Sequence, residues 1–308
     1  MKIAALAGGT GAAKFLRGLS AVTDPRAITI IGNTGDDFEL WGLAISPDLD
    51  TVTYTLAGRV DDAKGWGVGG DTFNCLGAMG DLGRETFSAL GDKDLAVHIR
   101  RTEALRAGAP LSAVTAALAT TLGVTSRILP MSDDRVRTRI RTPDRWLAFQ
   151  EFFVRDRCEP DVLDVAYEGA DRARPAPGVL DALSEADVVI ICPSNPVSSV
   201  GPILAVPGIR GALLETKAPI VAISPIVGDA AVSGPAGKMM QALRFEVSAT
   251  GVADAYQGSL DVLVVDRRDA DCAGRLRTRG IRVVTSDIIM SGREREASVA
   301  RAVLEAIA

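Results

Sequence analysis

Four aspartates, Asp36, Asp37, Asp48 and Asp50, lie within fifteen residues of one another, soon after an apolar run that is typical of a buried strand. Glycines, a proline and short polar residues surround them, as in loops at the edge of a sheet. Crowded carboxylates repel one another unless a cation or a hydrogen-bonding ligand lies between them. The segment 33–50 therefore predicts either a divalent-cation site or a solvated acidic loop, and the acidic loop is the commoner outcome for such a pattern taken alone.

A glycine-rich turn near the N-terminus suits an anionic ligand, whereas the aspartates suit a cation. Residues 2–7 are an apolar run of strand type, Gly8–Gly11 form a turn that glycine makes easily, and residues 12–19 are helix formers. Strand, glycine turn and helix start aim backbone N–H groups at an anion such as phosphate, and Lys14 adds a point charge there. The turn matches neither a Walker A loop nor the complete GxGxxG fingerprint, whose third glycine is replaced by Lys14. A tight turn without a ligand is the alternative.

Two further loops carry polar side chains after apolar runs. Ser194 and Asn195 follow the run 187–192, and ligands of open α/β sheets bind outside the ends of strands. The Asn195 amide offers a donor and an acceptor, which suits a base edge or a hydroxyl, although Asn-Pro is also an ordinary turn former. The segment 233–238 approaches a helix through two glycines and ends at Lys238, so it is either a second phosphate cradle or a surface loop.

His98 is the only histidine, so any imidazole base must be this residue. It lies in a helical pattern in which Asp94, His98 and Arg101 share one face by their three- and four-residue spacing. A helical histidine is more often packed or capped than catalytic, and the packed interpretation is favoured here. No nucleophile motif such as GxSxG occurs in the chain.

The composition indicates a protein with a large core. The chain has 308 residues, a hydrophobic content of 47% and a net charge of −5, and this acidic balance argues against a general nucleic-acid binder. The four cysteines are dispersed without CxxC or CxxH spacing, so neither a zinc site nor a disulfide framework is predicted, and a cytoplasmic location is expected. No signal peptide is predicted, because the first apolar run breaks at Gly8. No apolar run approaches the length of a membrane span.

Apolar runs of strand type alternate with helical patterns along most of the chain. The predicted strands share a Val, Ile and Leu character that is typical of burial on both faces: 2–7, 27–31, 187–192, 219–224, 261–266 and 280–284. Helical patterns lie between or after them: 12–19, 179–184, 237–243, 270–277 and 294–307. We therefore expect an α/β fold with a Rossmann-like, doubly wound, mainly parallel sheet, in which 1–308 form one domain.

The segment of about 61–161 is expected to be an inserted, mostly helical subdomain over the carboxyl ends of the sheet. Its helical patterns and its two strand-like runs are, in order, 72–79, 94–107, 111–122, 135–141 and 147–154. Turn residues separate the two strand-like runs. No Pro-, Gly- or Ser-rich linker bounds the segment, so it is expected to belong to the same domain.

A series of motifs occurs in order along the chain: GGTGAAKFLRGL, NTGDD, ISPDLDTVTYTLAG, GDKDLAVHIRRTEALRAG, LPMSDD, FQEFFV, CPSNPVSSVGPIL, AISPIVG, SGPAGK and GVADAY. Together they closely resemble the CofD family of 2-phospho-L-lactate transferases of coenzyme F420 biosynthesis. The resemblance implies a Rossmann-type fold, usually as a homodimer. It also implies Mg²⁺-dependent transfer of a phospho-carboxylate unit from a guanosine diphosphate conjugate to the deazaflavin alcohol FO, with release of GMP. The unit is 2-phospho-L-lactate, enolpyruvyl phosphate or a 3-phosphoglycerate analogue, and no side chain selects among them.

The resemblance implies roles for residues of the matching motifs. Asp50 is expected to be catalytic and to contact FO together with Lys93, a position where relatives often have arginine. The expected Mg²⁺ ligands are the aspartates, with the direct ligands left open: Asp36, Asp37, Asp48 and Asp50. The expected nucleotide and phosphate contacts lie in the glycine turn and the strand-end loops: Gly9, Thr10, Gly11, Lys14, Asn33, Ser194 and Asn195. Orientation and metal activation are ranked above base catalysis by Asp50.

The alternative function belongs to a different class. The gluconeogenesis-factor (YvcK-like) proteins share the glycine turn and an acidic loop, and bind a nucleotide sugar as regulators. The motifs SPDLDTVTYTLAG and GDKDLAVH favour the transferase. A nicotinamide dehydrogenase is disfavoured, because the third glycine is missing and Asn33 stands where an acidic residue is expected. The expected partners are therefore FO and a guanosine diphosphate-linked three-carbon acid, with no nucleic acid and no membrane.

Overall fold

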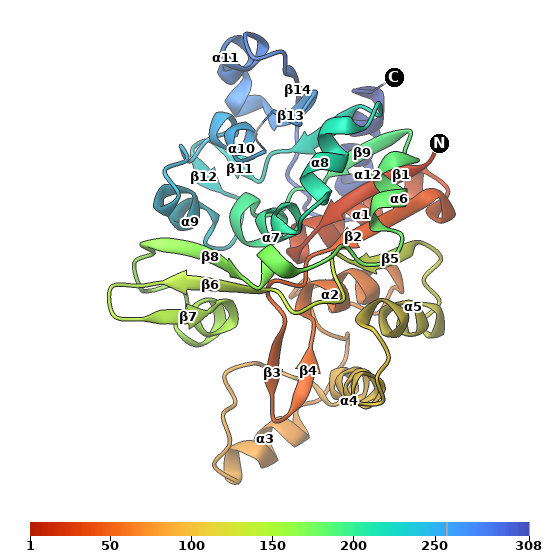
Figure 1. Cartoon of the computed structure of the whole chain (residues 1–308), viewed down its shortest axis with the longest axis vertical. Helices are drawn as coiled ribbons and strands as arrows, with labels where there is room; N and C mark the ends of the chain where they lie inside the picture. Colours follow the sequence, from red (N-terminus) through yellow and green to blue (C-terminus); the bar gives the residue numbers. More distant parts are fainter. Residues whose placement is uncertain (257, 308) are drawn as a thin grey trace.

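Seven parallel strands form the central sheet (Figure 1) of this computed structural model, which describes residues 1–256 and 258–307. The strands in sheet order are β14 (Arg282–Ser286), β13 (Val262–Asp266), β10 (Ile220–Ile223), β9 (Val188–Ile191), β1 (Ile3–Ala7), β2 (Ile28–Gly32) and β5 (Arg127–Pro130). The winding direction reverses at β1, because β2 pairs with one of its edges and β9 with the other. This is the doubly wound α/β topology that the sequence predicts.

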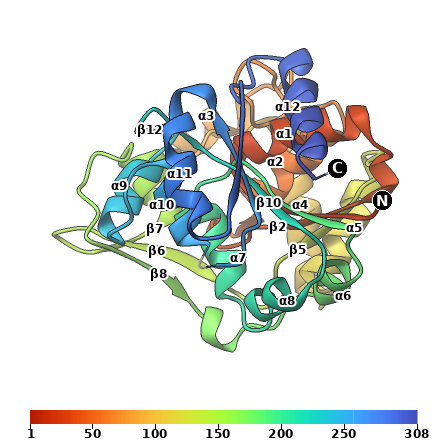
Figure 2. The same cartoon turned by 90° about the horizontal axis from the view of Figure 1, so that it is seen from above.

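Helices cover both faces of the sheet. The helices on one face are α1 (Gly9–Val22), α2 (Pro47–Leu56) and α12 (Arg293–Glu305), which share a core with Ile3 and Ala5. The helices on the other face share a core with Ala4 and Leu6. They are α6 (Val179–Ser184), α7 (Gly201–Ala205), α8 (Ile209–Glu215), α9 (Ala236–Ala242), α10 (Ala249–Ala255) and α11 (Ala273–Arg277). Figure 2 shows α1 and α12 together on one side of the sheet and α7 and α8 on the other. Every residue of β1 is buried because both of its faces are covered.

Six of the seven central strands overlap the runs predicted to be strands, although β2 and β14 extend one and two residues beyond them, and β5 is the exception. The β5 sequence RILP has only two apolar residues between an arginine and a proline, which is too short to show a period. It becomes a strand because its residues pair in register with β2, from Arg127 beside Thr29 to Pro130 beside Gly32. Pro130 is tolerated there because β5 is an edge strand.

The chain between β2 and β5 contains the aspartates. A hairpin of β3 (Phe38–Leu40) and β4 (Leu43–Ile45) follows Asp36 and Asp37, and the helices that come next are α2, α3 (Asn74–Asp81), α4 (Asp92–Arg106) and α5 (Leu111–Thr121). The expectation that the aspartates lie in loops is therefore wrong for Asp48 and Asp50, which belong to the first turn of α2. Proline at the start of a helix and acidic groups in its first turn both favour this helix. In Figure 1 the hairpin and α3 project from one end of the sheet.

The expected insertion 61–161 contains α3, α4 and α5, but also β5, so part of it belongs to the central sheet. A separate antiparallel sheet follows, with the strands β7 (Trp146–Ala148), β6 (Arg137–Arg141) and β8 (Asp164–Glu168). The predicted strand 147–154 ends early, because the Glu151 carboxylate accepts the Ala148 N–H and 151–155 form a turn of π-helix. A short hairpin joins β11 (Ile226–Val227) to β12 (Ala230–Ala231).

Within the described part of the chain, no single helix is long and apolar enough to cross a membrane. Two consecutive helical segments, Pro196–Ala205 and Ile209–Glu215, are long and apolar enough only when they are taken together, and they are bent by 88° relative to each other. Both parts contribute buried residues such as Ile203 and Leu213 to the protein core.

Candidate active site

The glycine turn and the acidic segment meet at the carboxyl ends of β1 and β2. Asn33, directly after β2, is fully buried, and its amide donates to Asp48 Oδ2 at 2.9 Å and to the Ser198 carbonyl at 3.2 Å. Its Oδ1 accepts the Gly35 N–H at 2.8 Å. A Cβ on Gly8 would lie 2.6 Å from Asp48 Oδ2. The two features that the sequence singles out are therefore in direct contact, and Asn33 holds them together.

The turn needs glycine because the backbone approaches its neighbours closely. Gly9 has a φ of +75°, which favours glycine, and a Cβ on Gly11 would lie 2.4 Å from the Pro193 carbonyl oxygen. The first N–H groups of α1 have no partner within the helix. The Gly9 backbone opposes the rise in the pKa of Asp48, so this helix end favours a negative charge beside it. Lys14 is half-buried one turn further on.

Asp36 lies beside Asp48, and Asp37 follows it directly before β3. The Ser46 hydroxyl donates to Asp37 Oδ2 at 2.8 Å. The Oδ1 atoms of Asp36 and Asp37 are buried and find no hydrogen-bond partner among the residues that the structure describes. Because an unsatisfied buried acceptor costs about 1–3 kcal/mol, and more when charged, these two oxygens are candidates for contact with a ligand.

Burial raises the pKa of all three carboxyls. It raises the pKa of Asp37 to about 7 and that of Asp48 to about 6, and it raises the pKa of Asp36 well above its usual value. The charge of Asp48 contributes to the rise at Asp36, whereas the Arg137 guanidinium opposes the rise at Asp37. Carboxyls with pKa values raised in this way at strand ends are typical of functional sites.

Asp50 belongs to a second, buried network that joins α2 to α4. Arg101, which is 2% exposed, forms a two-pronged ion pair with it: Nη1 lies 3.0 Å from Oδ2, and Nη2 contacts Oδ1. Arg101 Nη1 also lies 3.2 Å from His98 Nδ1. His98 Nε2 is 3.2 Å from Asp94 Oδ2, in a direction poor for a hydrogen bond, and the Tyr54 hydroxyl donates to Asp94 Oδ1 at 2.7 Å. Both imidazole nitrogens thus face protein groups, which agrees with a packed histidine.

Ser194 contacts the glycine turn, whereas Asn195 contacts the segment that follows it, and the polar atoms of both are used within the protein. Ser194 Oγ donates to the Gly8 carbonyl at 2.8 Å and accepts the Gly8 N–H at 3.3 Å. Asn195 Oδ1 accepts the N–H groups of Val197 and Ser198 and caps the π-helical turn Pro196–Val200. Ser194 therefore fixes the turn, and Asn195 fixes the helix that follows.

Lys93 and Lys238, two other candidates, both donate to backbone carbonyls. Lys93 Nζ lies 2.7 Å from the Gly70 oxygen and 3.4 Å from that of Gly69. Lys238 Nζ donates to the carbonyls of residues 158, 159 and 160, so it holds that loop in place and does not cradle a phosphate. Lys93 is exposed and lies at the start of α4, which carries His98 and Arg101.

The aspartates fit Mg²⁺ that is shared with a substrate better than a metal cage built by the protein alone. Among residues 1–256 and 258–307, no three Asp, Glu, His or Cys side chains converge closely enough to hold a metal ion. Mg²⁺ commonly takes one or two carboxylates together with substrate phosphates and water. The unpartnered oxygens of Asp36 and Asp37 and the mutual repulsion of Asp36 and Asp48 suit such a cation. The Asp50 charge is already balanced by Arg101.

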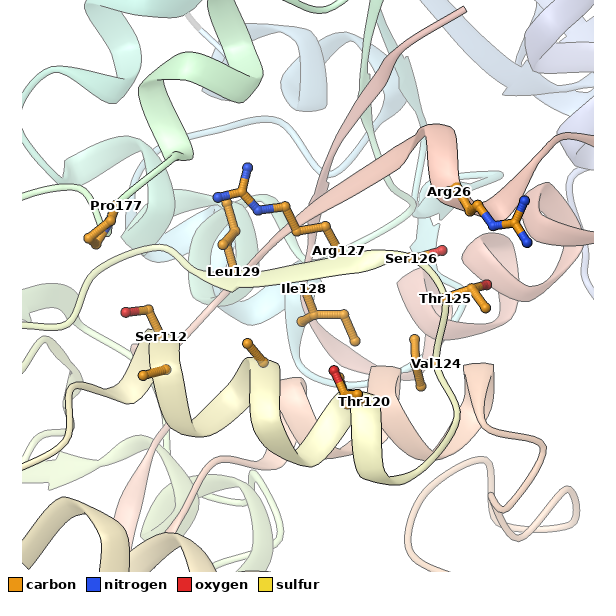
Figure 3. A pocket seen from close by; sticks show the side chains of 13 residues that line it. Arg26, Ser112, Thr120, Val124, Thr125, Ser126, Arg127, Ile128, Leu129 and Pro177 are labelled. Carbon is orange, nitrogen blue, oxygen red and sulfur yellow. The ribbon is translucent and has the colours of Figure 1, made fainter. Parts of the chain in front are cut away.

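A cavity of about 460 Å³ lies apart from these residues, between α5 and the edge strand β5 (Figure 3). Its lining includes Ser112, Thr120, Ser126, Arg127 and Leu129. None of the aspartates borders it. The candidate active site therefore rests on the chemistry of the turn and the carboxylates, and this cavity is a separate feature.

The fold and the site define a doubly wound α/β protein in which the glycine turn at the N-terminus of α1 adjoins buried carboxylates. The family model described as "2-phospho-L-lactate transferase CofD" matches residues 3–305, and the chain belongs to this family. It is therefore an enzyme of the 2-phospho-L-lactate transferase type. The match favours the transferase over the regulatory alternative.

Similar proteins match the chain almost from end to end. A phosphoenolpyruvate transferase of Streptomyces coelicolor is 46% identical, over 99% of this chain and 97% of that protein. A 2-phospho-L-lactate transferase of Methanosarcina acetivorans is 43% identical, over 97% of each chain. A solved structure of a UPF0052 family member from Bacillus halodurans has a TM-score of 0.70 at 18% identity and covers 98% of both chains, which supports the α/β fold.

Some residues of the site were not among those predicted from sequence. Ser46 donates to Asp37, Tyr54 donates to Asp94, and Arg137 lies beside Asp37. For Arg137 a signal existed, since arginines alternate at 135, 137, 139 and 141 and so share one face of a strand. The contact of that strand with the aspartates depends on tertiary structure.

Proposed function

We propose that this enzyme transfers a phospho-carboxylate unit from its guanosine diphosphate conjugate to the primary alcohol of FO, releasing GMP in the biosynthesis of coenzyme F420. Membership of the family supports the class of reaction. The observation that carries the proposal is the contact of the glycine turn with the buried carboxylates, where a Gly8 Cβ would lie 2.6 Å from Asp48 Oδ2. A diphosphate and a divalent cation need these two features side by side.

The reaction is a phosphoryl transfer without a covalent enzyme intermediate. The ribityl hydroxyl of FO attacks the phosphorus that bears the three-carbon acid, a new P–O bond forms, and the P–O bond to GMP breaks. The hydroxyl proton leaves to solvent or to the phosphate of GMP. Such reactions depend on alignment and charge stabilisation more than on covalent help.

Bound Mg²⁺ would be held by Asp36 and Asp48, with Asp37 beside them, and would neutralise charge on the diphosphate. The α1 N-terminus and Lys14 bind the phosphates from the opposite side. Asp50 accepts a hydrogen bond from the attacking hydroxyl and orients it. Both of its carboxylate oxygens already contact the Arg101 guanidinium, so orientation outranks base catalysis.

Arg137 is the residue best placed to recognise an anionic group of the donor. Its Nη1 donates to the carbonyls of Val136 at 2.7 Å and Thr34 at 3.4 Å. Among the described residues, no carboxylate oxygen lies within 4.0 Å of its guanidinium nitrogens, although Asp37 and Asp36 influence it at longer range. Burial lowers the pKa of Arg137, and an incoming phosphate or carboxylate would offset that cost.

The test is GMP release from purified protein supplied with FO, Mg²⁺ and one of three guanosine diphosphate conjugates, those of lactate, enolpyruvate and glycerate. Release is expected with at least one donor and only when FO is present. EDTA is expected to abolish it, and Mg²⁺ to restore it. No GMP from any donor would refute the transferase function, and the comparison among donors also identifies the three-carbon acid. A homodimer in the cytoplasm stays a prediction, which sedimentation and fractionation can check.

A further inference from the structure

The cavity between α5 and β5 is lined by polar and charged groups that none of the proposed roles uses. Its volume of about 460 Å³ lies within the range of small-molecule sites in proteins, roughly 300–1,000 Å³. It borders the edge of the central sheet, because β5 pairs with β2 on one side only. An edge strand also offers a ligand backbone groups without a strand partner.

Small side chains on α5 leave this space open. Ala113, Ala116 and Thr120 follow the three- and four-residue spacing of one helix face, and all three line the cavity. Figure 3 shows Thr120 on the helix and Ile128 of β5 on the strand that faces it. Larger apolar side chains on α5 would fill the gap, as they do in an ordinary contact between a helix and a sheet. The sequence therefore builds a hollow at this place.

The lining of the cavity is cationic. Arg26 and Arg127 border it, and no carboxylate does so. Among residues 1–256 and 258–307, neither guanidinium has a carboxylate oxygen within 4.0 Å. In Figure 3 Arg26 lies near Thr125 at one end, whereas the Arg127 guanidinium points toward the Pro177 end. The cavity thus has an unpaired positive charge toward each end.

The wall between the two arginines is mainly apolar. Two of the hydroxyls that border it are already used, since Ser112 donates to Asp133 at 2.9 Å and Ser126 donates to the Pro25 carbonyl at 2.8 Å. The apolar lining consists of Ala113, Ala116, Ala119, Val124, Ile128 and Leu129. A ligand that matches this wall has aliphatic carbons in its middle and an anionic group at each end.

Another face of α5 contacts the ion pair of the candidate active site. Thr115, Leu118 and Leu122 border a gap of about 10 Å³ together with Asp50 and Arg101. The helix therefore lies between the cavity and the ion pair that the proposed mechanism uses. Because closely packed helices move as units, a ligand that displaces α5 from β5 changes the packing on Arg101.

We propose that this cavity binds a small aliphatic dicarboxylate, with one carboxylate at Arg127 and the other at Arg26, and that binding lowers turnover through α5. The guanidinium group of arginine pairs with a carboxylate through two parallel hydrogen bonds. Inorganic phosphate fits less well, because the two arginines lie toward opposite ends of the cavity and one small anion reaches only one of them. None of the aspartates borders the cavity, so the dicarboxylate and the substrates bind at the same time.

Isothermal titration calorimetry of the full chain with glutarate, adipate and suberate tests the site. The titrations are run at constant ionic strength, because exposed arginines attract any anion weakly. At least one diacid is expected to bind with an affinity in the millimolar range or tighter, and both inorganic phosphate and the neutral diamide adipamide are expected to bind at least tenfold more weakly.

Two variants and two matched controls locate the binding. Arg127→Gln removes one charge, and Ala116→Leu fills the cavity, so each is expected to weaken diacid binding about tenfold. Arg277→Gln and Ala117→Leu are the controls, because both residues are exposed and neither lines the cavity. The controls are expected to bind the diacid as the wild type does.

GMP release, measured with and without saturating diacid, tests the coupling. Turnover of the wild type is expected to fall at least twofold, and turnover of Ala116→Leu to stay unchanged by the same diacid. No binding of any diacid, or equal affinity in the wild type and Arg127→Gln, would overturn the site. Binding that leaves GMP release of the wild type unchanged would overturn the coupling through α5.

Discussion

Replacing Asp37 with asparagine is expected to stabilise the metal-free protein and to lower its activity. The carboxylate is buried beside Asp36, and one of its oxygens has no partner among the described residues. Asparagine keeps an acceptor for the Ser46 hydroxyl but removes the charge. The same change removes a charge that the proposed cation needs. Opposite effects on stability and activity are typical of a functional site.

The magnitude follows from the raised pKa of Asp37, about 7 against an ordinary value of 3.8. Because its pKa is raised in the folded state, the folded state favours the protonated carboxyl. The cost of ionising it begins near pH 4, grows with pH and levels off above pH 7. At 1.36 kcal/mol per pKa unit, a difference of about 3 units makes asparagine better by about 4 kcal/mol at pH 8. At pH 5 the advantage is about 1.5 kcal/mol.

Urea unfolding in EDTA at pH 5 and pH 8, together with GMP release, measures both effects. Asp144→Asn, in an exposed turn, is the control for removal of one charge and is expected to change neither property. An Asp37→Asn variant less stable than the wild type at pH 8 would refute the reasoning. An equal gain at both pH values would show that the gain has another cause than ionisation of this carboxyl.

Three further substitutions test the site. Asp50→Asn is expected to lower turnover about 100-fold. It is also expected to lower the free energy of unfolding by about 3 kcal/mol, because buried Arg101 loses its charged partner. Normal turnover of the folded variant would exclude a catalytic Asp50. Gly8→Ala places a methyl group 2.6 Å from an Asp48 oxygen, so half-maximal activity is expected to need about tenfold more Mg²⁺. Gly77→Ala, where a methyl group meets open space, is the control and is expected to leave the Mg²⁺ requirement unchanged. Arg137→Gln is expected to raise KM for the donor about tenfold without affecting FO, and an unchanged donor KM would contradict its proposed role.

Local sequence was sufficient to predict those features that depend only on residues close together in the chain. The glycine turn and α1 were predicted because strand, turn and helix signals follow one another within 2–19. Six central strands were predicted because burial on both faces leaves a continuous apolar run. The common face of Asp94, His98 and Arg101 follows from helical spacing alone, and the structure confirms that all three are buried.

The chain by itself thus determined the α/β class, the glycine turn between strand and helix, and the resemblance of the aspartate motifs to those of a transferase family. Only the tertiary structure shows that Asp48 contacts the glycine turn and that Asp50 belongs to a separate ion pair. Asn33 and Gly8 bring Asp48 to the glycine turn, whereas Arg101, fifty-one residues away in sequence, takes the charge of Asp50. The physical reason is that the energy of a carboxylate depends on burial and on the nearest opposite charge, and both are set by segments that only folding brings together.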